Sequence, residues 1–163
     1  ELKVNHRILR SRRFLLAMGA NYKPDFVDDS IAKNYLSFRD LKSYELHNLP
    51  KNIIIVGSKP VALELAQTLS IFGKHITLIV QERRILPQED RDISILIQAQ
   101  LEADGIRIQT NSTVSQIKTI NNQKWLQAGD RALSADEIII ADYRQPNIAG
   151  LNLAGVDVKY DRL

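Results

Sequence analysis

The sequence predicts an α/β fold: a Rossmann-like doubly wound parallel sheet with a β-meander, preceded by a hairpin from part of another domain. Two observations lead to this prediction. Between residues 51 and 141, strands that are apolar throughout alternate with amphipathic helices, the pattern of parallel strands buried on both faces. The first of these strands ends in a glycine turn that opens a helix, as in folds that bind phosphate groups.

The first strand and helix are the clearest elements. Asn52–Val56 is an apolar run bounded by Pro50 and Gly57, which predicts a buried strand. Apolar residues then recur at helical spacing over Val61–Phe72. Gly73 stands where a glycine commonly ends a helix. The pair predicts the opening βα unit of the sheet.

A second βα unit follows. Ile76–Val80 is again apolar throughout and predicts the second buried strand. The apolar residues from Ile93 to Leu101 predict an amphipathic helix that stops at Gly105. Ile106–Gln109 begins a third strand.

The period then changes from helical to alternating, which predicts antiparallel strands. Val114–Ile120 and Lys124–Ala128 are separated by Asn121 and Asn122, residues that favour a tight hairpin turn. The unit closes with Ile138–Ala141, another apolar strand. The predicted order is therefore βαβαβ, a meander, and a last parallel strand.

An internal repeat indicates where one domain ends and the next begins. Asn5–Ala17 aligns without gaps on Gly129–Ala141, each copy predicting a turn, a short strand and a buried strand. In the first copy the apolar strand is Phe14–Ala17. Because most of its sheet is missing here, we expect this strand to leave an exposed edge or an apolar patch, and to pack on the following domain, pair with another copy of the chain or be mobile. Chance similarity of two hairpins is the alternative. With Gly19–Pro50 as an irregular connector, we expect the tail of one domain and its connector over 1–45, and a second domain over 46–163.

Composition and charge exclude several classes of function. The chain has 163 residues, 44% hydrophobic and 25% charged, and no apolar run approaches a membrane span. It starts at Glu1 without a secretion-signal pattern, so we expect a cytoplasmic protein that binds no membrane. The basic cluster formed by Arg7, Arg10, Arg12 and Arg13 lacks interleaved aromatic residues, which favours a solvated hairpin over nucleic-acid binding. The absence of cysteine excludes disulfides, thiolate metal sites and a redox cysteine pair within this chain.

The glycine turn carries the predicted chemistry. Gly57 supplies the tight turn, and the helix N-terminus that follows would face the negative charge of a pyrophosphate. Ala62 replaces the glycine that permits close helix-to-strand packing, and Pro60 suits a first helical turn. Lys59 stands where a second glycine normally lets the pyrophosphate approach the backbone. We therefore predict that Lys59 limits binding.

These motifs resemble those of a known family. Residues 57–66 include Glu64 at the glutamate of the family's glycine motif, and residues 141–147 read ADYRQPN where the family pattern is Ala-Thr-Gly-Arg-x-Pro-Asn. Leu86, Pro87 and Asp90 also match. The chain thus resembles the nicotinamide-binding domain of the class I pyridine nucleotide-disulfide oxidoreductases over nearly its whole length. The segment up to Gly19 resembles the end of that family's flavin domain, in agreement with the repeat.

The resemblance implies an NAD(P)H-binding domain of an FAD-dependent oxidoreductase, with nicotinamide delivering hydride to flavin in the intact enzyme. The partners would be the rest of that flavoprotein and, in a homo-oligomer, a second copy of the chain. Glu64 would lie near the nicotinamide and flavin rings, and Gly19 on the flavin side. The family's catalytic histidine lies in a domain absent here, so no catalytic residue or metal site is assigned. The pyrophosphate would be lined by Gly57, Ser58, Lys59, Pro60 and Val61.

The choice between NADH and NADPH is weakly encoded. Val80 occupies the position where an acidic residue would bind the ribose hydroxyls of NAD, and Gln81 follows it. Arg83 or Arg84 could pair with a 2′-phosphate, which gives NADPH a slight preference. Solvation of a loop is the alternative role of both arginines.

A second function from another class stays open. Lys59, Val80, Asp142 and Tyr143 all depart from the family pattern. They favour a degenerate Rossmann domain that no longer binds dinucleotide and acts as a scaffold or interaction module, because a fold alone does not fix a function.

We predict that the isolated chain does not retain FAD, because only the tail of a flavin domain precedes the single glycine turn. The purified protein should be colourless. The measurement is the visible absorbance after desalting, and stoichiometric flavin absorbance would contradict the prediction.

Overall fold

The computed structural model describes residues 1–22 and 34–160. It divides into two compact units, one built from residues 1–20 and 146–163 and the other from residues 21–145. Part of the predicted connector Gly19–Pro50 lies outside the described residues. The described part contains no helix that is both long and apolar enough to cross a membrane. The two units are treated separately below.

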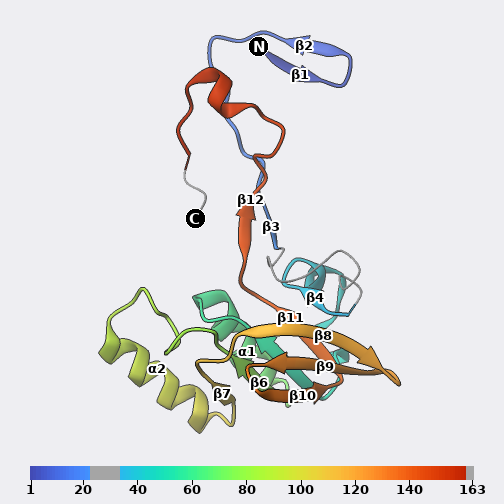
Figure 1. Cartoon of the computed structure of the whole chain (residues 1–163), viewed down its shortest axis with the longest axis vertical. Coiled ribbons are helices and arrows are strands. Elements are labelled where there is room, and N and C mark those ends of the chain that lie inside the picture. Colours follow the sequence, from blue (N-terminus) through green and yellow to red (C-terminus); the bar gives the residue numbers. More distant parts are fainter. Residues whose placement is uncertain (23–33, 161–163) are drawn as a thin grey trace. The chain divides into compact units, whose positions relative to one another are not determined.

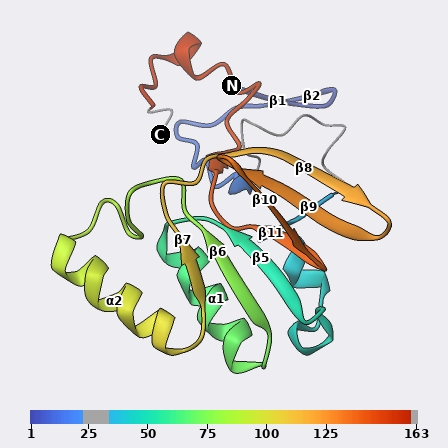
Figure 2. The same ribbon diagram turned by 60° about the horizontal axis from the view of Figure 1, so that its bottom comes forward.

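The larger unit is organised around a five-stranded parallel sheet in the order β4-β11-β5-β6-β7 (Figure 2). β5 is the central strand, and it pairs in parallel with β11 on one side and β6 on the other. The strands of the sheet are β4 (Leu36–Ser37), β5 (Asn52–Val56), β6 (His75–Ile79), β7 (Arg107–Gln109) and β11 (Glu137–Ile140).

Two different layers cover the faces of this sheet (Figures 1 and 2). The helices α1 (Pro60–Ile71) and α2 (Arg91–Ala103) lie on one face, where Ile53 and Leu78 belong to the first hydrophobic core. An antiparallel meander in the order β10-β9-β8 lies on the other face. Its strands are β8 (Val114–Ile120), β9 (Gln123–Ala128) and β10 (Arg131–Ala135).

The alternation of side chains along the sheet explains both cores. In β5, Ile53 and Ile55 point into the helix-side core, whereas Ile54 and Val56 point into the meander-side core. All four are at most 4% exposed. A strand buried on both faces must be apolar at every position, which is the signal that the sequence carries.

The predicted fold class is confirmed, and the two helices and the strands for which the sequence analysis gave bounds begin and end within two residues of their predicted positions. The sequence analysis missed β4, a two-residue strand that pairs in parallel with β11 at the sheet edge. Short 3-10 helices follow it at Asp40–Ser43 and Leu46–Asn48. Two residues carry no periodicity, so this strand leaves no readable pattern.

The smaller unit corrects one prediction. Its hairpin of β1 (Leu2–Val4) and β2 (Arg7–Leu9) has the turn and short strand that the repeat predicted. The strand predicted over Phe14–Ala17 does not form. These residues are exposed, with Leu15 at 93%, which agrees with the expected apolar patch. A strand needs a hydrogen-bonded neighbour, and none of the described strands pairs with this segment.

Three further elements complete the described chain. β3 (Ala20–Tyr22) and β12 (Arg144–Pro146) form a two-stranded sheet of their own. A last 3-10 helix spans Leu153–Val156.

Ile139 tests the helix-side core. It is fully buried on β11, so Ile139→Ala leaves a cavity and should lower the free energy of unfolding by about 2–5 kcal/mol. Ile71 on α1 is 80% exposed, so the same substitution there should change that energy by about 0.5 kcal/mol or less. Urea denaturation followed by circular dichroism measures both. Equal effects at the two positions would contradict this account of the core.

Candidate functional site

The turn between β5 and α1 has no room for a side chain at Gly57. A Cβ atom added there would lie 2.7 Å from the Cβ of Ala62 and 2.9 Å from the carboxyl of Asp142. The Gly57 N–H donates to the carbonyl of Ile79, 3.0 Å away, which ties the turn to β6. The sequence analysis assigned to glycine a close helix-to-strand approach, and the structure has that approach at Gly57 itself.

Asp142 lies in this turn. It follows β11, the neighbour of β5, and its Oδ2 accepts a hydrogen bond from the backbone N–H of Ser58 at 2.6 Å. The Ser58 hydroxyl lies 3.3 Å from the same oxygen. Asp142 is 9% exposed, and Oδ1 has no hydrogen-bond partner among the described residues. Sequence reasoning marked Asp142 only as a departure from the Ala-Thr-Gly pattern and missed this contact.

The environment of Asp142 disfavours its charge. Burial raises the pKa of this carboxyl above its ordinary value. Hydrogen bonds from the backbone N–H groups of Ser58 and Lys59, the Lys59 ammonium and the Ser58 hydroxyl act in the opposite direction without cancelling the effect of burial. The carboxyl is therefore held at the positive end of α1 in a site too dry to stabilise its charge fully.

The first turn of α1 places the other residues of the predicted pyrophosphate site. Lys59 precedes the helix with extended backbone (φ −90°, ψ 167°), is exposed, and makes no side-chain hydrogen bond to the helix end. Pro60 begins the helix and Val61 is half-buried beside it. Gly57, Ser58 and these three residues thus make up the turn between β5 and α1, and their contact with a pyrophosphate stays a prediction.

Glu64 lies apart from that turn. It is exposed on the next turn of α1 and lines an open groove of about 500 Å³ between α1 and α2, with Leu63, Ile93 and Ile97 among the other lining residues. The groove is mainly apolar. The position of Glu64 near the nicotinamide and flavin rings stays a prediction.

In the segment after β6, some polar side chains form hydrogen bonds within the protein and others are exposed to solvent. Val80 is fully buried, and Gln81 accepts a hydrogen bond from the Tyr143 hydroxyl at 3.0 Å. Arg84 donates to the carbonyls of Pro87 and Glu89, both 2.9 Å away, so it holds the loop. Arg83 is exposed and has no hydrogen bond or ion pair within residues 1–22 and 34–160.

Tyr143 explains the glycine in the family pattern. It has a φ of +66°, in the left-handed region that a bulky residue enters at a cost of roughly 1–2 kcal/mol. The family has glycine here, which adopts this conformation freely. In this chain the hydrogen bond to Gln81 and packing against the meander-side core hold the strained residue in place.

Gly19, predicted on the flavin side, belongs to the smaller unit. Its φ is +68°, and its carbonyl accepts a hydrogen bond from the Asn147 N–H at 3.1 Å. The Asn147 side chain donates to the Met18 carbonyl at 3.0 Å. Asn147, the last residue of the segment that matches the family pattern over 141–147, therefore meets Gly19 within the smaller unit.

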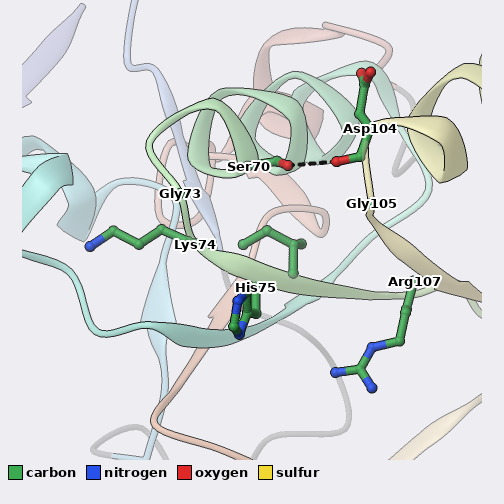
Figure 3. Close-up of a pocket in the computed structure, with 8 residues that line it drawn as sticks. Ser70, Gly73, Lys74, His75, Asp104, Gly105 and Arg107 are labelled. Carbon is green, nitrogen blue, oxygen red and sulfur yellow. Dashed lines mark hydrogen bonds between the residues drawn. The ribbon is translucent and has the colours of Figure 1, made fainter.

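A second cavity of about 500 Å³ lies at the opposite end of the parallel strands, where β6 and β7 begin (Figure 3). There the Ser70 hydroxyl donates to the Asp104 carbonyl at 3.0 Å, which joins the ends of α1 and α2. His75 and Arg107 also line it. The described residues contain no cluster of three or more His, Asp or Glu side chains that could hold a metal ion.

The comparison with protein families settles the class of protein. The family model described as pyridine nucleotide-disulphide oxidoreductase matches residues 1–163, so the chain belongs to that family. Homologues include the mercuric reductase of Lysinibacillus sphaericus, 28% identical over 97% of this chain. The dihydrolipoyl dehydrogenase of Bacillus subtilis (strain 168) is 34% identical over 69% of this chain.

Solved structures agree with this assignment. The HOCl-induced flavoprotein disulfide reductase RclA from Escherichia coli superposes with a TM-score of 0.77 at 26% identity, over 89% of this chain and 33% of that one. The putidaredoxin reductase in its covalent complex with putidaredoxin shares the fold, with a TM-score of 0.81 at 20% identity over 96% of this chain and 40% of that one. The chain spans 29% of the mercuric reductase and 25% of the dehydrogenase, so these relatives are much longer proteins.

The raised pKa of Asp142 predicts a pH-dependent stability. Above the ordinary aspartate value of 3.8 and up to the raised value, the native carboxyl keeps a proton that the unfolded chain has lost. The native state then binds more protons, so this group's contribution to the free energy of unfolding falls as pH rises through the interval. Each pKa unit of difference corresponds to about 1.4 kcal/mol.

Asp142→Asn keeps an oxygen for Ser58 and removes the charge. Relative to the unmodified chain, the variant should gain stability as pH rises through this interval and hold a constant advantage above it. Urea denaturation at several pH values measures the difference. An advantage that stays constant or shrinks over the interval would contradict the assignment.

Proposed function

We propose that this chain binds NADH or NADPH as the nicotinamide-binding domain of an FAD-dependent oxidoreductase. In the intact enzyme it would present the nicotinamide to the flavin, and the cofactors would carry out the hydride transfer. This chain's own residues would bind and orient the dinucleotide. FAD would belong to the intact protein, with Gly19 on its side.

One observation carries the proposal: the Gly57 turn stands at the carboxyl end of the central strand, where the chain's course across the sheet reverses. From β5 the sheet grows toward β6 and β7, whereas β11 and β4 lie on the other side. Ligands of open α/β sheets bind at such a switch point. The backbone N–H groups of Ser58 and Lys59 at the start of α1 are suitable donors for a pyrophosphate.

The preference between the two nucleotides would be set by the segment after β6. Val80 offers no carboxylate to the ribose hydroxyls of NAD, and Arg83 has its guanidinium exposed. Arg84 is engaged with the loop carbonyls. These observations favour NADPH, with Arg83 as the residue that would meet a 2′-phosphate.

A degenerate Rossmann domain that serves as a scaffold or interaction module is the second candidate. The observation that favours it is the Asp142 carboxylate on the Ser58 N–H, because an internal anion there meets the requirement of the helix end without a ligand. Binding of neither nucleotide under any condition would support this candidate.

Titration calorimetry with NADH and NADPH tests the proposal on the 163-residue chain. We expect weak binding of one or both, and tighter binding by Lys59→Gly, because the Lys59 side chain opposes close approach of the pyrophosphate. The ammonium gains about 1 kcal/mol at most at a solvated site, less than the several backbone hydrogen bonds at stake.

Lys59→Ala is the matched control, because it removes the charge and keeps the Cβ atom. A gain in the glycine variant alone would identify the Cβ as the obstacle. Weaker binding in both variants would show that Lys59 is a phosphate ligand and that the steric prediction is wrong.

A further inference from the structure

We propose that Asp142 is an internal anion that competes with the dinucleotide pyrophosphate for the backbone N–H groups of Ser58 and Lys59, and so weakens the binding of NADH or NADPH by this chain. The inference rests on the proposed function and names the residue that regulates the same site. It concerns a position at which this chain departs from the family pattern.

The contested donors lie at the start of a 12-residue helix. The first N–H groups of a helix have no partner within it, and the helix dipole makes this end positive, so an anion is favoured there. No side chain of the helix's own cap satisfies them, since Lys59 makes no capping hydrogen bond. A negative group placed at this end, whether from the protein or from a ligand, is therefore stabilised by these N–H groups.

Asp142 already holds this position from the neighbouring strand. Its Oδ2 is 2.6 Å from the Ser58 nitrogen, and the Lys59 N–H also acts on the carboxyl. The Lys59 ammonium is the charged group that faces it. Only 9% of the surface of Asp142 is exposed. The carboxylate is therefore packed inside the turn.

The unsatisfied oxygen shows that the arrangement is not a complete structural cap. Oδ1 is buried and has no hydrogen-bond partner among the described residues, although a carboxylate oxygen normally accepts two or more. It would lie only 2.9 Å from a Cβ at position 57, so it is pressed against the bare backbone of Gly57. That bare backbone is the surface that a pyrophosphate uses in dinucleotide folds.

The two anions exclude each other for two reasons. Both need the same N–H donors. Two negative charges close enough to share those donors also repel each other strongly, because little water is present to screen them. The adjacent residue reinforces the arrangement, because the Tyr143 hydroxyl bonds Gln81 and links the segments that follow β11 and β6, the two strands that flank β5. Removing the carboxylate should therefore release the donors to a ligand.

The test compares the unmodified chain with Asp142→Asn and Asp142→Thr. Asparagine removes the charge at nearly constant shape, and threonine restores the residue of the family pattern and shortens the side chain. Calorimetric titration with NADH and NADPH at pH 7.5 measures binding, and circular dichroism checks that each variant is folded. We expect at least tenfold tighter binding by the threonine variant and a smaller gain by the asparagine variant.

Asp136→Asn is the matched control. The Asp136 carboxylate also accepts a backbone N–H, that of Asn52 at 3.0 Å, but it lies at the opposite end of β5. This variant should bind as the unmodified chain does. A tenfold gain there as well would overturn the inference, since the effect would then follow net charge and not the turn.

The outcomes separate this inference from the proposed function. Binding by the unmodified chain with no gain in either Asp142 variant overturns the inference alone. Binding by a variant but not by the unmodified chain supports the inference and overturns the proposed function of this chain in favour of a degenerate domain. Binding by none of the proteins overturns both.

Discussion

The close approach at Gly57 is the constraint on which the candidate site depends. Three parts of the chain meet there: the end of β5, the first turn of α1 at Ala62, and the segment after β11 at Asp142. The contact between Gly57 and Asp142 spans 85 positions of the chain, so it exists only when the parallel sheet has formed. Because a single methyl group at position 57 would collide with both neighbours, the geometry of the site and the packing of the fold cannot be varied independently.

This coupling gives the helix N-terminus two possible uses. An anion at the start of α1 stabilises the helix whether it comes from the protein or from a ligand. When the protein supplies it, the N–H groups of the helix end have a partner without a ligand, and a ligand must displace that contact. The Asp142 carboxylate is only partly stabilised at this helix end. Burial raises its pKa by more than the hydrogen bonds from the N–H groups lower it. A ligand anion that stays partly in solvent would not bear the same desolvation cost.

The sequence predicts the sheet well because β5, β6 and β11 are buried on both faces, a condition that leaves an apolar run whatever the surroundings. It predicts the glycine turn because only glycine meets the steric demand there. Phe14–Ala17 shows the limit of the same reasoning. Its apolar run is identical in kind, but without strands beside it the segment is exposed, since hydrophobic pattern encodes a strand only together with its neighbours.

Side-chain roles that depend on tertiary pairing could not be read from the chain. Arg83 and Arg84 are adjacent and chemically identical, yet the structure commits only Arg84 to the loop carbonyls. The contact of Asp142 with Ser58 joins residues 84 apart. In each case the missing information is the direction of a side chain in the folded state, which one sequence without its structure does not contain.

The two departures after β11 act as one unit. Asp142 holds the segment to α1 and Tyr143 holds it to Gln81, so side-chain contacts fix a stretch that the family pattern fixes with threonine and glycine. The strained backbone at Tyr143 costs roughly 1–2 kcal/mol, and the hydrogen bond and packing of the ring offset a cost of that size. With an anchored tyrosine in place of an unstrained glycine, the turn is more rigid and less adaptable. Because the rigid segment carries the carboxylate on the anion donors, the same exchange that stabilises the turn opposes a ligand there.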